Sequence, residues 1–276
     1  MGLLIAGFVL CLCTGCAVNP ITGDEELMLI SEKQDIEIGR HYAPEIEKQM
    51  GGRIDNNDLQ DYIDSVGQRV ARVSQKPNLE YHFVALNHKS VNAFALPGGY
   101  LFVTLGMLEN LRTEAQLAAV LAHEIVHVVA RDTANMMSNE IGLNLLIMGA
   151  AVAGGSEALT TAQVATMVLG LQYSKADERQ ADLGGMKYMV RAGYDPQGMV
   201  EIMQILESRQ RDTRDDFMST HPSPINRVGY LKRRIHSRYS KLPGLRVGRE
   251  DYQRSVLDRL PKRNPDLPQK QSLAHQ

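Results

Sequence analysis

The sequence lacks several features that would assign a function at once. Its 276 residues contain no internal repeat, no phosphate-binding P-loop and no dinucleotide-binding fingerprint, so the enzyme classes that carry these motifs are not indicated. Tryptophan is absent, and the formal net charge is only -2. With 43% hydrophobic residues, this balance excludes a disordered chain and does not favour a polyanion-binding protein. The length suffices for one sizeable domain with a substantial core.

Cysteine is also scarce, and all three cysteines lie at the start of the chain, at Cys11, Cys13 and Cys16. Residues 2–15, GLLIAGFVLCLCTG, are uncharged and too short for a membrane span of about 20 residues. The run is typical of an export signal, and CTGC resembles a lipobox. We therefore expect a leader over residues 1–16 and lipidation of Cys16. An ordinary cleaved signal and an uncleaved anchor are the alternatives.

The small net charge hides an asymmetry along the chain. Residues 209–276 contain 16 Lys and Arg against 7 Asp and Glu, whereas residues 1–208 contain 14 against 25. A basic segment can contact nucleic acid or anionic lipid. No aromatic-interleaved basic motif supports nucleic acid, so we expect this segment to pack on the acidic body or to face a membrane.

The stretch AHEIVHVVARD, residues 122–132, carries the strongest chemical signal. The preceding residues predict a helix that begins after Thr113, with Gln116 completing a capping-box pattern. Positions four apart share one helix face, so His123 and His127 can bind one ion. Glu124 lies about 100° around the helix, where it can reach a metal-bound water. The alternative is a pair of histidines with ordinary partners, but burying them without a partner is costly.

A catalytic zinc site needs three protein ligands and one open position, so the third ligand decides the class of peptidase. A metzincin would have Gly at position 130 and His at 133, and this chain has Ala130 and Thr133. A predicted second helix, within residues 173–196, offers three carboxylates instead: Asp177, Glu178 and Asp182. Glu178 and Asp182 share a face, so one can hold zinc while the other orients an imidazole. A solvated acidic face is the other interpretation.

HEIVH, followed some fifty residues later by DERQAD, resembles the gluzincin peptidases of the CAAX prenyl protease, HtpX, Oma and BepA type. NAFALPGGYLFVTLGML (92–108), THPSPINR (220–227) and the segment that starts at residue 19 are similar to further motifs of these enzymes. The resemblance implies one zinc ion on His123, His127 and Glu178, Glu124 as the general base, and Asp182 as the partner of a ligating histidine. It assigns no role to Asp132.

The resemblance also implies a fold and a function. We expect an α+β, mostly helical, zincin-like domain over residues 17–240, with a small antiparallel or mixed sheet beside the metal helix. A basic, proline-rich tail would follow over residues 241–276. The expected activity is zinc-dependent hydrolysis of misfolded or unassembled envelope proteins, at the periplasmic face of the outer membrane, which the protein would reach through its lipid anchor. A membrane-associated chaperone or assembly factor with a latent zinc site is the alternative.

Three residues are candidates for stabilising the oxyanion: His221, Arg227 and Tyr173. Pro222 and Pro224 stiffen the loop around His221, which can therefore hold an imidazole at a fixed distance from a metal. Its ring could donate to the oxyanion, or it could occupy the open metal position. The resemblance implies the second role, a self-inhibited resting state.

The remaining elements are expected from their patterns. Helices are predicted over residues 31–50, capped by Ser31, and 56–75, and strands over 80–87, 92–99 and 100–108. By resemblance, the strand residues Asn92, Ala93, Phe94 and Ala95 form a sheet edge that binds the substrate as an added strand. The apolar run 141–171 is interpreted as a helical hairpin that could form a lid, a membrane-touching element or a buried core pair.

Overall fold

The computed structural model describes residues 16–139, 170–209 and 216–261. The predicted leader before Cys16, nearly all of the apolar run 141–171 and the last residues of the tail lie outside these ranges. Among the described residues, no helix is both long and apolar enough to cross a membrane.

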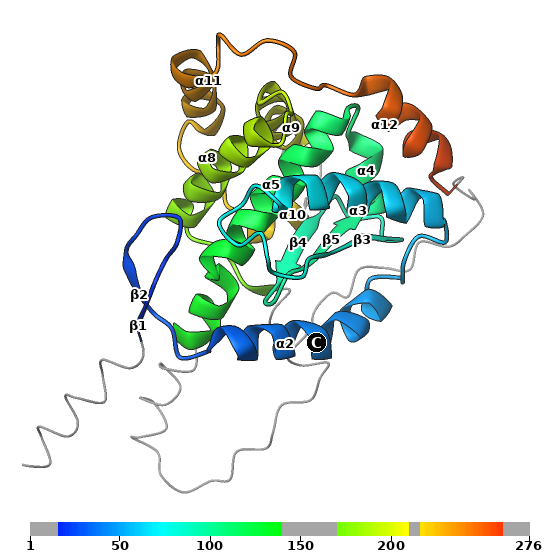
Figure 1. Ribbon diagram of the computed structural model, residues 1–276. Coiled ribbons are helices and arrows are strands. Elements are labelled where there is room, and N and C mark those ends of the chain that lie inside the picture. Colours follow the sequence, from blue (N-terminus) through cyan, green and yellow to red (C-terminus); the bar gives the residue numbers. More distant parts are fainter. Residues whose placement is uncertain (1–15, 140–169, 210–215, 262–276) are drawn as a thin grey trace, which may run out of the picture.

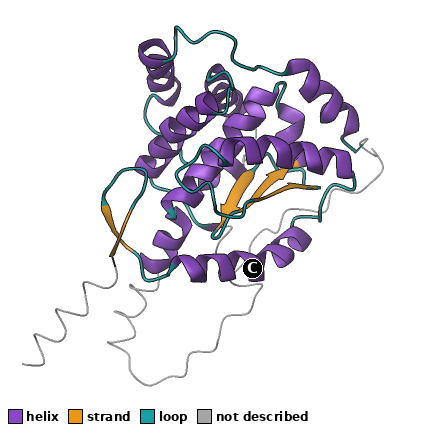
Figure 2. Cartoon of the chain, in the orientation of Figure 1, coloured by secondary structure: helices purple, strands orange, loops and turns teal. Residues whose placement is uncertain are grey.

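A small mixed sheet lies beside a central buried helix, α5 (Glu114–Ala130) (Figure 1). The sheet contains β3 (His82–Leu86), β4 (Ala93–Leu96) and β5 (Tyr100–Thr104) in the order β3-β5-β4. β3 runs parallel to β5, and β4 runs antiparallel to it. Helices make up most of the remaining described chain (Figure 2). The expected α+β, mostly helical fold is confirmed.

The sheet is buried on both faces, because alternate strand residues belong to two different hydrophobic clusters. Phe83 and Ala85 of β3 pack in the larger cluster with α3 (Asn57–Ala71) and α5, whereas Val84 and Leu86 pack in the smaller one with α2 (Glu32–Gln49). The strand predicted over residues 100–108 is too long. It ends at Thr104, whose hydroxyl accepts from the Met107 amide and caps the short helix α4 (Leu105–Asn110).

Local capping determines where the helices begin. Ser31 caps α2 in a complete capping box with Gln34, as the sequence predicts. Thr113 accepts from the Gln116 amide at the start of α5. The predicted capping box is not complete, because the Gln116 side chain accepts from the Arg112 amide and not from the Thr113 amide.

Helix α8 (Lys175–Arg191) packs closely along α5, and two adjacent glycines permit the approach. A Cβ on Gly185 would lie 3.1 Å from the carbonyl carbon of Ala122 and from the His123 amide nitrogen, and one on Gly184 would lie 3.0 Å from Val126. Any larger side chain would push the helices apart. This close packing brings the carboxylates of α8 to the histidines of α5. Helix α9 (Gln197–Arg209) packs on the N-terminal half of α5.

The C-terminal segment does not form a separate tail after residue 240. Before residue 240 lie α10 (Asp216–Thr220) and α11 (Arg227–Arg238), and after it follow α12 (Arg249–Ser255) and the 3-10 helix η2 (Leu257–Arg259). Tyr252 and Val256 are fully buried in the larger hydrophobic cluster. The predicted boundary at residue 240 is therefore wrong, because these side chains need the core of the domain to leave water.

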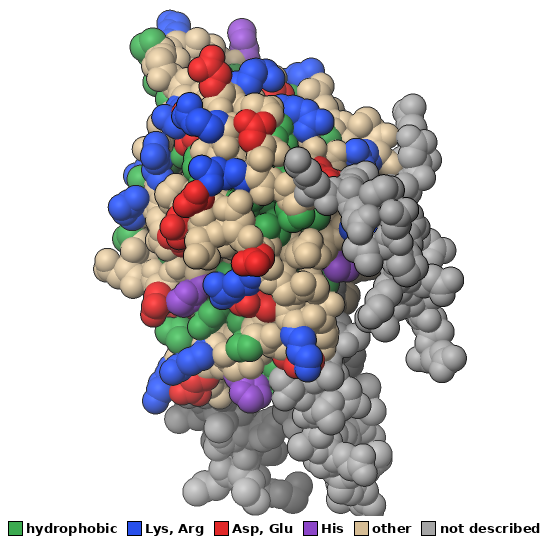
Figure 3. Space-filling model, turned by 90° about the vertical axis from the view of Figure 1, so that its right-hand side faces the viewer, with side chains coloured by type: hydrophobic (Ala, Val, Ile, Leu, Met, Phe, Trp, Pro, Cys, Tyr) green, Lys and Arg blue, Asp and Glu red, His purple; other side chains and the backbone are tan. Residues whose placement is uncertain are grey.

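Basic residues of this segment pair with acidic ones elsewhere in the domain: Arg246 with Glu114, and Arg259 with Asp58. The expectation that the basic segment packs on the acidic body is confirmed for these residues. Side chains of both charge signs are interspersed on the face drawn in Figure 3. At the other end of the described chain, β1 (Cys16–Val18) and β2 (Glu25–Leu27) form a separate antiparallel pair, in which Cys16 is exposed.

Candidate metal centre

Helix α5 places three polar side chains in the protein interior. His123, Glu124 and His127 are each at most 1% exposed. The two histidines lie one turn apart, and their Nε2 atoms are 3.1 Å from each other. The helix spacing thus brings two nitrogens to one point, as the sequence predicts.

Helix α8 adds Glu178 from the opposite side. Its Oε2 lies 3.6 Å from His123 Nε2, and its Oε1 lies 3.5 Å from His127 Nε2. The neighbouring Asp177 is used elsewhere, because it forms a capping box with Ser174 at the exposed start of α8. Of the two neighbouring carboxylates, only Glu178 therefore faces the histidines.

His221 enters from the loop that follows α10. Its ring stacks on Phe217 with 4.2 Å between the ring centres, and its Nδ1 lies 3.2 Å from the Phe217 carbonyl oxygen. A carbonyl can only accept, so Nδ1 carries the proton and Nε2 keeps its lone pair in the neutral ring. That Nε2 lies 3.4 Å from Glu124 Oε1. The loop therefore aims a metal-ligating atom at the centre.

The four residues fit a zinc ion. Ligand atoms of His123, His127, Glu178 and His221 all lie within 4.8 Å of one another. Tetrahedral zinc with nitrogen ligands at about 2.0–2.1 Å separates its ligand atoms by about 3.3 Å. The separations between His123, His127 and Glu178, 3.1 to 3.6 Å, bracket that value. Three nitrogens and one carboxylate oxygen are also a donor set typical of zinc.

Orphaned polar atoms support the same interpretation. Both carboxylate oxygens of Glu124, both of Glu178, and Nε2 of His221 are buried without a hydrogen-bond partner among the described residues. Buried acceptors without donors are costly, and a cation offsets that cost. Asp182 and Asp132 accept from the Nδ1 atoms of His123 and His127. In the neutral rings that bind a metal, each Nε2 then carries only a lone pair, so the two Nε2 atoms cannot hydrogen bond to each other.

Each histidine of α5 has a carboxylate behind it. His123 Nδ1 lies 3.1 Å from Asp182 Oδ1, and His127 Nδ1 lies 2.6 Å from Asp132 Oδ2. Such carboxylates fix the ring orientation and raise the basicity of the ligating nitrogen. The sequence analysis gave Asp132 no role. Asp132 lies just past the end of α5, and the left-handed backbone of Arg131 (φ 63°), which the residues alone do not predict, turns the chain there.

Arg227, at the start of α11, holds the carboxylates of α8 in place. Its Nε and Nη2 donate to the two oxygens of Asp182 at 2.8 and 2.7 Å, and Nη2 lies 3.0 Å from Glu178 Oε2. The Tyr230 hydroxyl donates to Asp182 as well. Only Nη1 of Arg227 has no hydrogen-bond partner among the described residues. Arg227 was a predicted oxyanion donor, but two of its three guanidinium nitrogens position Asp182 and Glu178.

Tyr173 lies flat against the metal centre rather than pointing its hydroxyl at it. Its ring stacks on His127 with 3.8 Å between centres and 8° between planes. The hydroxyl lies 3.3 Å from the Thr133 hydroxyl. Tyr173 therefore restricts the rotation of the His127 ring.

The electrostatics of the cluster favour a cation. Burial alone would lower the pKa of the His123 and His127 rings, yet Glu178, Asp182 and Asp132 raise both, that of His127 to about 10. Burial alone would raise the pKa of Glu178, but His221 and His123 hold it well below its ordinary value. The carboxylates therefore stay ionised and draw positive charge into the site.

The predicted substrate strand lies at an edge of the sheet. In the described part of the chain, β4 pairs only with β5. The Thr104 amide donates to the Asn92 carbonyl, which makes this a hydrogen-bonded pair. Because such pairs alternate along antiparallel strands, the backbone groups of Ala93 and Ala95 point away from β5.

The chain was compared with known proteins. The model of peptidase family M48 matches residues 57–235. The chain is 28% identical to the beta-barrel assembly-enhancing protease of Escherichia coli over 230 residues, 79% of this chain and 47% of that protein. It is 31% identical to the mitochondrial metalloendopeptidase OMA1 of Schizosaccharomyces pombe over 191 residues, 68% of this chain and 55% of that protein. The chain thus spans about half the length of these relatives. The matched segment contains the metal cluster, α8 and most of α11, and the chain belongs to peptidase family M48.

Proposed function

We propose that this protein is a zinc-dependent endopeptidase. The observation that supports this most directly is the unpartnered carboxylate of Glu124 beside His123, His127 and Glu178 in a buried cluster. A bound zinc ion polarises the scissile carbonyl and lowers the pKa of water. His123, His127 and Glu178 would hold the ion. Asp182 and Asp132 orient the two rings, and Arg227 keeps Asp182 ionised.

Glu124 serves as the general base in this proposal. It takes the proton of the attacking water and passes it to the nitrogen of the leaving amine. Its side chain has no hydrogen bond to break first, because both oxygens lack a hydrogen-bond partner among the described residues. The candidates for an oxyanion donor are Nη1 of Arg227, the Tyr173 hydroxyl and His221.

The substrate would bind as an extra strand along β4. The backbone groups of Ala93 and Ala95 that point away from β5 can pair with a polypeptide, whatever its side chains. Recognition through the backbone suits an enzyme that acts on many unfolded segments. We therefore propose misfolded or unassembled polypeptides of the cell envelope as substrates. The E. coli relative, named as a protease that enhances β-barrel assembly, supports this class.

A second function has one specific observation in its favour. His221 Nε2 faces the centre together with the three other ligand atoms, so it can occupy the fourth metal position. We propose that it does so in the resting protein, where it blocks the attacking water. If this state persisted, the protein would act as an assembly factor with a latent zinc site.

A casein digest separates the two functions and tests the first. We expect purified, zinc-loaded protein to cleave casein, a chelator such as 1,10-phenanthroline to stop cleavage, and added zinc to restore it. His221→Ala should cleave faster and still contain zinc. An enzyme for which His221 donates to the oxyanion would instead slow by about 100-fold. If neither protein cleaved casein, the latent function would be favoured over the peptidase.

We also propose that Cys16 carries a lipid that holds the protein at a membrane, at the periplasmic face of an outer membrane. In the structure, Cys16 is exposed at the start of β1. Metabolic labelling of cells with palmitate should mark the wild-type protein and leave Cys16→Ser unlabelled. A wild-type protein without label would contradict the anchor.

A further inference from the structure

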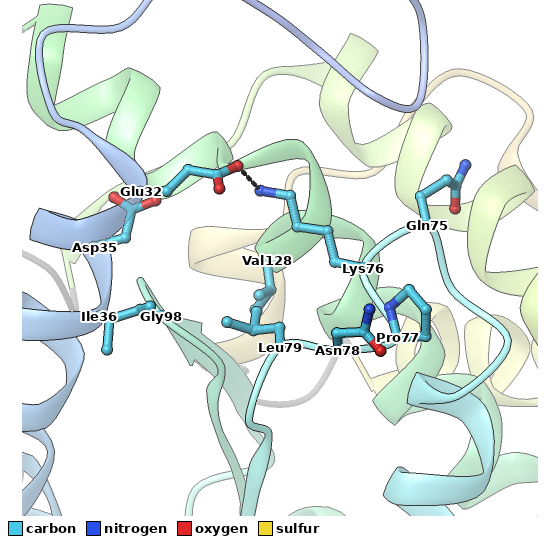
Figure 4. Close-up of a pocket in the computed structure, with 10 residues that line it drawn as sticks. All are labelled: Glu32, Asp35, Ile36, Gln75, Lys76, Pro77, Asn78, Leu79, Gly98 and Val128. Carbon is cyan, nitrogen blue, oxygen red and sulfur yellow. Dashed lines mark hydrogen bonds and ion pairs between the residues drawn. The ribbon is translucent and has the colours of Figure 1, made fainter.

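Cavities follow one another along β4 and past the metal centre. One is lined by Ala95, Tyr173 and His221, and a narrow one beyond it is lined by Ala95, Leu96 and His127. The narrow cavity shares Asp35, Gly98 and Val128 with a larger one of about 330 Å³. This larger cavity, which we call the distal pocket, has no role in the proposed chemistry (Figure 4).

The distal pocket combines an apolar wall with one unsatisfied acceptor. Ile36, Leu79 and Val128 line it. Asp35, from the first turns of α2, is only 6% exposed. Its Oδ2 accepts from Arg131 Nε at 2.5 Å, but its Oδ1 has no hydrogen-bond partner among the described residues. A buried acceptor of this kind costs free energy unless a donor reaches it.

The rim of the distal pocket carries a second carboxylate. Glu32 of α2 pairs with Lys76, from the loop after α3, at 2.5 Å. The pair is drawn across the top of Figure 4. The Glu32 side chain is 68% exposed, so this ion pair adds little stability and can exchange partners. An entering cation would meet Glu32, which can leave Lys76, and the buried Oδ1 of Asp35.

The cavities relate the distal pocket to a substrate bound along β4. The metal centre lies level with Ala95, which lines the cavities on both of its sides. β4 ends at Leu96, and the chain turns back into β5 over residues 97–99, so Gly98 of the distal pocket lies just past the end of the strand. A substrate strand that runs along β4 past the metal centre would therefore meet the distal pocket beyond the end of β4.

We infer that the distal pocket is a specificity subsite that takes a lysine or arginine side chain of the substrate, beyond the residues that contact the metal centre. The aliphatic stem packs on Ile36, Leu79 and Val128, and the cationic head donates to Oδ1 of Asp35. This inference rests on the proposed peptidase function, because the same bound strand must pass the metal centre.

Binding and cleavage of matched peptides test the subsite. The probes are fluorescein-labelled decapeptides of alternating alanine and valine, with one lysine, norleucine or glutamate scanned through each position. Norleucine has a similar stem to lysine but lacks the donor. Affinity is measured by fluorescence anisotropy on Glu124→Gln protein, and kcat/KM on the wild type. At one position only, we expect the lysine peptide to exceed the norleucine peptide about tenfold in both affinity and kcat/KM, and the glutamate peptide to be weakest. A hydrogen bond to a charged group is strong enough for a tenfold difference.

Variants of the pocket connect this preference to Asp35. In Asp35→Asn, the ratio of the affinity for the lysine peptide to that for the norleucine peptide should fall below about threefold. Because both peptides are measured on the same variant, a loss of folded protein does not change this ratio. Leu79→Trp, which fills the pocket and leaves Asp35 and Arg131 unchanged in sequence, should remove the advantage of both side chains. His41→Ala, in a separate cavity on α2, is the control and should keep the tenfold ratio.

The outcomes distinguish the subsite from the peptidase function. Cleavage without any preference for lysine would overturn the subsite and leave the peptidase function intact. Selective binding of the lysine peptide without cleavage would support the subsite and contradict the peptidase function. If no peptide bound, the subsite would be overturned, whatever happened to casein.

Discussion

Helix α5 buries one carboxylate at its N-terminus and another in its C-terminal half, and the two differ in their hydrogen-bond partners. At the N-terminal end, Glu114 is 1% exposed and accepts hydrogen bonds from the hydroxyls of Tyr62 and Tyr194 and from Nε and Nη2 of Arg246, at 2.7–2.8 Å. Ten positions later along the same buried helix, the Glu124 carboxylate is fully buried, and neither oxygen has a hydrogen-bond partner among the described residues.

The difference separates a structural carboxylate from a chemical one. A buried carboxylate with all its donors in place joins elements, and Glu114 joins α3, α5 and the C-terminal segment. A buried carboxylate without donors is costly and persists where a ligand or a reaction needs it. Substitution of Glu114 should therefore affect stability, and substitution of Glu124 should affect catalysis.

The largest effect is expected at a second pair of carboxylates, Glu178 and Asp177, of which only Asp177 has a hydrogen-bond partner among the described residues. Glu178→Ala should lose zinc, because it removes one of three ligands, whereas Asp177→Ala should keep it, because Asp177 only caps α8. Metal content measured by atomic absorption decides between them. Stoichiometric zinc in Glu178→Ala would mean that another carboxylate is the ligand.

The next effect concerns Glu124 itself. Glu124→Gln should keep zinc and lower kcat for casein cleavage by at least about 100-fold, because an amide cannot accept the proton. The unfolding midpoint should not fall, since no hydrogen bond of the carboxylate is lost. Glu114→Gln is the matched control at the other end of α5 and should keep most of its activity. Full proteolysis by purified, zinc-loaded Glu124→Gln would remove Glu124 as the base.

The smallest effect is expected at Glu114. Glu114→Ala should lower the free energy of unfolding by about 2 kcal/mol at pH 7 while zinc stays bound. Removing one partner of a buried pair costs about 3–5 kcal/mol, and Arg246, which is 40% exposed, recovers part of this from water. Urea unfolding of the two proteins measures the difference. An unchanged unfolding midpoint would show that the hydrogen bonds of Glu114 add no net stability.

The pH dependence of this difference has a definite sign. Burial alone would raise the pKa of Glu114, but hydrogen bonds from Arg246, Tyr62 and Tyr194 hold it below its ordinary value. The stability from this lowered pKa is fully present above the pKa of the unfolded chain, about 4.3, and is lost as the pH falls through the folded pKa. The advantage of the wild type over Glu114→Ala should therefore shrink below about pH 4.

The sequence by itself determined the features that depend on neighbours along the chain. The i, i+4 spacing of His123 and His127 puts both rings on one face of any helix, and Ser31 caps α2 through residues within its own first turn. The family, a small antiparallel or mixed sheet and its edge strand were expected from motifs along the chain that resemble those of the family. Such features need no knowledge of how distant segments pack.

Only the tertiary structure decided which distant groups meet. Asp177 and Glu178 are adjacent in the sequence, and only the close packing of α8 on α5 through Gly185 directs Glu178 to the histidines. The contact of Asp132 with His127, and the use of Arg227 to hold Asp182, depend likewise on where a chain turns and which helices lie side by side. Periodicity defines the face of a helix, but the partner of that face depends on packing between segments far apart in the chain.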